Sequence, residues 1–118
     1  MSVKHWLEAA RPRTLPLASS AVLAAGGATL QADTHFDWTV FSLALLTVVL
    51  LQVLSNFAND LGDHEHGVDD AGRVGPQRAI QQGIISASKM RRAVIITSVM
   101  AVVSGCLLLF TSRATQAN

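Results

Sequence analysis

Three long stretches without a charged residue constrain the fold more than any other feature of this sequence. Residues 15–32, 38–58 and 93–112 contain no Asp, Glu, Lys or Arg, so the nine basic and eight acidic residues of the 118-residue chain all lie outside them. An apolar helix of about 20 residues, rising 1.5 Å per residue, matches the hydrocarbon core of a bilayer, about 30 Å thick. We therefore predict an all-α, multi-span helical membrane protein with transmembrane helices at about 15–32, 38–59 and 93–112.

The composition excludes several other classes of protein. Half of the residues are hydrophobic and 14% are charged, whereas a soluble domain has about 25% charged residues. The formal net charge of +1 is too small for a nucleic-acid-binding domain. Since Cys106 is the single cysteine, no disulfide can form within the chain. The first apolar stretch also resembles the core of a signal peptide, but two full spans follow it, so we expect it to be retained.

The N-terminal residues predict a short helix and a break. Val3, Trp6, Leu7 and Ala10 recur at helical spacing, and an apolar stripe with Trp beside basic residues is typical of a helix at the membrane interface. The segment Arg11-Pro12-Arg13-Thr14-Leu15-Pro16 then ends this helix and begins the first span, because the first turn of a helix tolerates proline.

The distribution of Lys and Arg near the spans predicts the topology. Basic residues occur in segment 1–14 and in the acidic loop predicted at about 60–92, whereas residues 31–37 contain none. We therefore expect the N-terminus and the acidic loop on the cytoplasmic side of the membrane. Ser86 or Ser88 is expected to cap the third long helix, since a serine side chain accepts bonds from free amides at a helix start.

A polar stripe is the most informative feature of the second span. Its members recur at helical spacing and occupy an arc of about 140°: Gln52, Ser55, Asn56, Asn59, Asp60 and Asp63. Polar groups at membrane depth are costly unless they face protein or water, so this polar stripe predicts a functional site. The alternative is a set of hydrogen bonds between helices, followed by ordinary solvated acids.

Acidic and basic residues follow one another along the predicted acidic loop. Asp60, Asp63 and Asp69 precede Arg73 and Arg78. Carboxylates close together repel one another unless a cation lies among them, and Mg²⁺ is typically bound by one or two carboxylates together with substrate phosphates. Because arginine pairs well with phosphate oxygens, the pattern favours a site that handles a diphosphate.

These residues resemble a known family. Asn59-Asp60-Leu61-Gly62-Asp63 is similar to the first aspartate-rich motif of the intramembrane aromatic prenyltransferases. Further segments resemble the branch that prenylates 1,4-dihydroxy-2-naphthoate in menaquinone biosynthesis: residues 11–16, residues 52–58, Gly67-Val68-Asp69 and residues 73–78.

The resemblance implies a nine-helix membrane fold and Mg²⁺-dependent transfer of a polyprenyl group from polyprenyl diphosphate to 1,4-dihydroxy-2-naphthoate. An allylic cation would form, and the naphthoate ring would attack it with loss of its carboxyl group. The implied catalytic residues are Asp60 and Asp63. The implied metal ligands are Asn59, Asp60, Asp63 and Asp69, and the implied substrate-binding residues are Asn56, Asn59, Arg73 and Arg78.

The resemblance covers only the N-terminal portion of such an enzyme. The second aspartate-rich motif of the family does not occur in the 118 residues, and Gly67 stands where the wider family often has another Asp. We therefore expect an inactive fragment or truncated product, whose uncovered polar stripe favours self-association. The alternative function is a non-catalytic three-span membrane protein with a binding or assembly role.

Overall fold

Four α-helices and a short 3₁₀ turn make up almost all of the computed structural model, which describes residues 3–32, 35–65 and 85–117. The helices are α1 (Val3–Ala10), α2 (Leu15–Gln31), α3 (Trp38–Glu65) and α4 (Ala87–Ala117), and the turn, η1, covers Pro12–Thr14. No strand occurs in these residues. The prediction of an all-α fold is therefore confirmed for this part of the chain.

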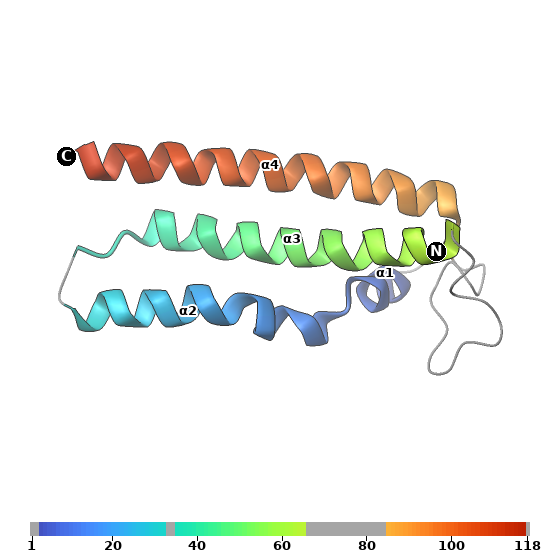
Figure 1. The fold of residues 1–118 in the computed structure, drawn as a ribbon, viewed down its shortest axis with the longest axis horizontal. Coiled ribbons are helices and arrows are strands. Elements are labelled where there is room, and N and C mark those ends of the chain that lie inside the picture. The colour runs from blue at the N-terminus through green and yellow to red at the C-terminus, as the bar shows by residue number, and fades with distance from the viewer. Residues whose placement is uncertain (1–2, 33–34, 66–84, 118) are drawn as a thin grey trace.

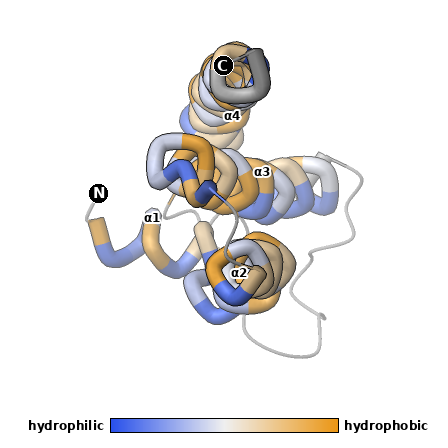
Figure 2. The backbone as a smooth tube through the Cα atoms, turned by 90° about the vertical axis from the view of Figure 1, so that its left-hand side faces the viewer, coloured by the Kyte–Doolittle hydropathy of each residue, from blue (hydrophilic) through white to orange (hydrophobic). Residues whose placement is uncertain are grey.

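The three long helices lie alongside one another, with α3 between α2 and α4 (Figures 1 and 2). Their bundle measures 55 × 25 × 25 Å. We call the end where α3 finishes the Asp60 end, and the end where α3 begins the Trp38 end. Helix α1 lies at the Asp60 end and runs across the bundle axis, which the two perpendicular views show together.

The predicted break after the first helix occurs at Arg11. This residue has the left-handed backbone conformation φ 53°, ψ 71°, and it is the one non-glycine residue with positive φ among those described. Proline disfavours the α conformation of the residue before it, so Pro12 forces Arg11 out of the helix. Thr14 closes the turn, donating its backbone N–H and its hydroxyl to the Arg11 carbonyl at 3.0 and 2.8 Å.

Side-chain caps set the starts of α3 and α4. Asp37 accepts the backbone N–H groups of Thr39 and Val40 at 2.9 and 3.2 Å. Ser86 accepts the backbone N–H of Lys89 at 3.1 Å, which confirms the predicted cap. Such bonds satisfy amides that have no partner in the first helical turn.

Three helix boundaries extend beyond the spans drawn from hydropathy. Helix α3 continues to Glu65, six residues beyond the predicted end of its span at 59. Helix α4 begins at Ala87, directly after the predicted cap Ser86 and six residues before its predicted span at 93, and it continues to Ala117, five residues beyond the span. Residues 60–65 and 87–92, predicted as loop, are therefore helical. Hydropathy detects where a helix leaves the hydrocarbon, whereas backbone hydrogen bonding continues into the polar region.

The buried core lies at the Asp60 end, where α1, α3 and α4 meet. It consists of Ala9, Phe57, Leu61, Ile85 and Met90. The rings of Trp6 and Phe57 pack edge to face with centroids 5.7 Å apart, so α1 is fixed to α3 by an aromatic contact.

Small and hydroxyl-bearing residues lie at contacts between the long helices. The hydroxyls of Thr47 and Ser104 lie 2.7 Å apart and join α3 to α4. A Cβ at Gly26 on α2 would lie 2.6 Å from a ring carbon of Phe41 on α3. Small residues allow helices to approach closely in membranes, where packing drives their association.

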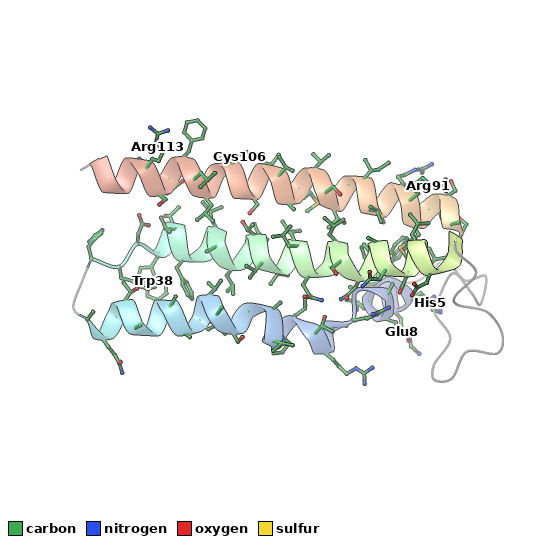
Figure 3. The ribbon with its side chains drawn as sticks, viewed as in Figure 1. His5, Glu8, Trp38, Arg91, Cys106 and Arg113 are labelled. Carbon is green, nitrogen blue, oxygen red and sulfur yellow. The ribbon has the colours of Figure 1, made fainter. Side chains whose placement is uncertain are left out.

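Among the residues that the structure describes, two helices are long and apolar enough to cross a membrane, over Trp38–Asp63 and Ala87–Ala114. The remaining predicted span, α2, is not among them: it has 17 residues and a length of about 26 Å, near the lower limit for crossing a bilayer. Trp38, labelled in Figure 3, begins α3 and is 65% exposed. Exposed Trp at the end of an apolar helix is typical of the membrane–water interface.

Candidate metal and diphosphate site

Asn56 is the best-connected member of the polar stripe. Its side chain is 3% exposed and donates hydrogen bonds to the Ala10 carbonyl at 2.8 Å and to the Thr14 hydroxyl at 3.0 Å. One turn earlier, the side-chain amide of Gln52 donates to Oδ1 of Asn56 at 3.2 Å. Asn56 therefore ties the N-terminal segment to α3, and its amide N–H groups are used within the chain.

Arg11 and Asp60 form an ion pair between the N-terminal turn and the next turn of α3. The Arg11 guanidinium donates to Oδ1 of Asp60. The Asp60 side chain is 3% exposed and that of Arg11 is 29% exposed. A carboxylate removed from water in this way is costly unless a positive charge or several hydrogen bonds compensate it, and Arg11 supplies that charge.

The polar stripe divides into two faces in the structure. Asn56 and Asp60, four residues apart, face the N-terminal segment and are buried, whereas Ser55 and Asn59 are exposed. Asp63 is half-buried. The stripe was predicted as a single polar surface, and the difference arises because α1 and η1 cover one edge of it.

The donor chemistry of these residues suits a hard divalent cation. Carboxylate oxygens of Asp60 and Asp63 and the amide oxygen of Asn59 are ligands that Mg²⁺ prefers. Arg11 competes for one of these oxygens, since it already contacts Oδ1 of Asp60. Within residues 3–32, 35–65 and 85–117, no three His, Cys, Asp or Glu side chains form a group that could hold a metal ion.

Three predicted site residues lie outside the described part of the chain. They are the proposed metal ligand Asp69 and the proposed diphosphate ligands Arg73 and Arg78. Among the described residues, His5, Glu8 and Arg91 lie at the Asp60 end of the bundle, as Figure 3 shows.

Sequence reasoning missed the roles of Arg11 and Thr14 in this site. Both residues belong to the segment that ends the first helix and that resembles the naphthoate-prenylating branch, but neither was given a role in the site. Glu8, three residues before Arg11, is the nearest acidic residue in the sequence, so the sequence gives no signal for a pair with Asp60. Asp60 lies 49 residues away from Arg11, so spacing alone does not identify it.

The cavity at the Trp38 end is separate from this site. It has a volume of about 350 Å³, and its lining includes Val22, Gly26, Val40 and Phe41 between α2 and α3. None of the predicted site residues lines it.

Comparison with known proteins agrees with the resemblance inferred from the motifs. The model of the UbiA prenyltransferase family matches residues 20–117. The chain is 47% identical over 113 residues to the 1,4-dihydroxy-2-naphthoate octaprenyltransferase of Escherichia coli K12, an alignment that covers 96% of this chain and 36% of that protein. The enzyme of the same name from Haemophilus influenzae is 44% identical over 108 residues, covering 91% and 35%.

A more distant relative with the same name, from Mycobacterium tuberculosis, is 34% identical over 107 residues, covering 91% of this chain and 36% of that protein. The chain thus spans about a third of the length of the curated relatives it matches. No solved structure matches it significantly. Since the family model covers most of its length, the chain belongs to the UbiA prenyltransferase family, whose members are multi-span membrane proteins.

Proposed function

We propose that this chain supplies the first metal and diphosphate half-site of a prenyltransferase. The enzyme would transfer a polyprenyl group from polyprenyl diphosphate to 1,4-dihydroxy-2-naphthoate, in menaquinone biosynthesis. The observation that carries the proposal is the position of Asn59, Asp60 and Asp63 at one end of an apolar helix, where Arg11 forms an ion pair with Asp60. The names of the relatives support the choice of substrate.

In this proposal Asp60 and Asp63 are the catalytic carboxylates, and they hold Mg²⁺ together with Asn59 and Asp69. The ion would supply positive charge against the diphosphate as the bond between prenyl carbon and oxygen breaks. Asn59, Arg73 and Arg78 would bind the diphosphate oxygens. Asn56 supports the site from one turn below by holding the N-terminal turn against α3.

The test uses a chimera, in which this chain replaces the aligned N-terminal region of the E. coli relative. Asp60→Ala and Asp63→Ala are each expected to lower Mg²⁺-dependent prenyl transfer by about 10²-fold or more, because each removes one electrostatic contact to the reacting diphosphate. Glu8→Gln, an exposed carboxylate change at the same end of the bundle, is the control. Unchanged turnover in both Asp variants would reject the proposal.

We also propose that the Asp60 end of the bundle lies on the cytoplasmic side of the inner membrane. His35, shortly before the start of α3, and Ser88, in the first turn of α4, are both exposed, and the starts of these two helices lie at opposite ends of the bundle (Figure 1). In a Cys106→Ser background, His35→Cys should react with an impermeant thiol reagent from outside, and Ser88→Cys from the cytoplasm. The reverse pattern would contradict the proposed orientation.

The second candidate function is a non-catalytic membrane protein with a binding or assembly role. The use of Asn56 and Asp60 in contacts within the chain favours it, since a purely structural stripe needs no ligand. These contacts also cover part of the surface that was expected to drive self-association. A chimera that folds but transfers no prenyl group would favour this candidate.

A further inference from the structure

We propose that Arg11 is a positioning residue that holds the Asp60 carboxylate and releases it when a divalent cation binds. The inference rests on the proposed function, because it takes Asp60 as a cation ligand. It adds that the N-terminal segment is part of the site, and that its arginine and the cation occupy the same carboxylate in turn.

Arg11 and a divalent cation compete for the carboxylate of Asp60. The Asp60 side chain is 3% exposed, and Arg11 contacts its Oδ1. A guanidinium and a divalent cation on one carboxylate repel each other, and they do so more strongly away from water. Binding of the cation at Asp60 therefore requires the Arg11 side chain to withdraw.

The backbone of Arg11 has a left-handed conformation. A left-handed conformation is unfavourable for a residue with a side chain, and it persists only where neighbouring contacts impose it. Here those contacts are the turn closed by Thr14 and the two hydrogen bonds from Asn56 to Ala10 and Thr14. Arg11 is thus presented to Asp60 by a turn whose geometry depends on the polar stripe itself.

Arg13 offers a comparison with Arg11. It lies two residues further along the same turn, carries the same charge and is exposed. Replacing Arg13 removes the same charge from the same end of the bundle without opening the ion pair to Asp60. Arg13→Gln is therefore a matched control for the general electrostatic effect of losing one positive charge.

The experiment measures Mn²⁺ affinity by electron paramagnetic resonance on the 118-residue chain in nanodiscs of neutral lipid. Arg11→Gln is expected to bind Mn²⁺ at least about tenfold more tightly than wild type, the factor that corresponds to one charge-assisted hydrogen bond. Arg13→Gln should stay within about twofold. Arg11→Lys, which keeps the charge but loses the planar fork of donors, should fall between Arg11→Gln and wild type.

Hydrogen exchange provides a second measurement that does not depend on affinity. In wild type, Mg²⁺ should increase exchange at the amides of Arg11 and Thr14, because withdrawal of the guanidinium loosens the turn. In Asp60→Asn, Mg²⁺ should cause no such increase.

The outcomes separate this inference from the proposed function. If Asp60→Asn abolishes Mn²⁺ binding but Arg11→Gln binds no more tightly than wild type, the role of Arg11 is wrong and the metal site stands. If Asp60→Asn binds Mn²⁺ as wild type does, the metal site itself is wrong. Absence of binding in wild type and in Arg11→Gln alike would also overturn the inference.

Discussion

Replacement of Asn56 by leucine tests whether the N-terminal segment is held by the polar stripe. The Asn56 side chain is 3% exposed and donates two hydrogen bonds to the segment. Leucine keeps the branched shape of the side chain but has no donor, so the half-buried Ala10 carbonyl loses a partner. Each lost bond costs about 1 kcal/mol net, and an unsatisfied buried acceptor costs about 1–3 kcal/mol. We expect Asn56→Leu to destabilise docking of residues 3–14 by about 2–4 kcal/mol.

The assay is hydrogen exchange of residues 3–14, measured by mass spectrometry in nanodiscs. A loss of this size should increase the population of the undocked state by about 30- to 700-fold, while α3 and α4 remain protected. The control is Ser55→Leu, at the exposed neighbouring position of the stripe, which should change exchange little. Exchange of the segment within about twofold of wild type, at unchanged helical content, would refute the reasoning.

Two further predictions concern contacts between the long helices. A Cβ at Gly26 would lie 2.6 Å from a ring carbon of Phe41, whereas one at Gly27 meets nothing within 4 Å. Gly26→Ala should therefore destabilise the bundle by about 1–3 kcal/mol, whereas Gly27→Ala should stabilise it by up to about 1 kcal/mol. Thermal unfolding in detergent measures both effects, and equal effects would contradict the close approach of Gly26 to Phe41. For the hydroxyl pair of α3 and α4, 2.7 Å apart, a double-mutant cycle of Thr47→Val and Ser104→Ala should give a coupling energy of about 0.6–1.7 kcal/mol, and a value near zero would show that the pair contributes nothing.

The sequence predicts the helices well because their signals are local. Uncharged stretches identify α3 and α4, the motif around Pro12 identifies the break, and Ser86 identifies a cap. The end of α3 was placed too early, because the hydropathy ends at Ala58 although the polar residues keep the helical spacing. That spacing had indicated a helix through Asp63, and it was the better guide to the backbone.

The site is predicted only in part, because its decisive contacts are not local. The residue types and spacing of Asn59, Asp60 and Asp63 indicate cation chemistry without any structure. The ion pair of Asp60 with Arg11 joins residues 49 positions apart, and no periodicity within α3 contains that information. The division of the polar stripe into a covered and an exposed face likewise depends on how α1 packs, which Trp6 and the core beneath it determine.

The most direct test of the central claim asks whether Asp60 contacts the metal during prenyl transfer. In the chimera with the E. coli relative, Asp60→Cys replaces a hard oxygen ligand by a thiolate, which favours softer ions. We expect transfer to 1,4-dihydroxy-2-naphthoate with Mg²⁺ to fall by about 10²-fold or more and Cd²⁺ to restore it at least about tenfold, while Glu8→Cys keeps its Mg²⁺ activity. Undiminished Mg²⁺ activity in Asp60→Cys, or an activity that is the same with either ion, would contradict the account.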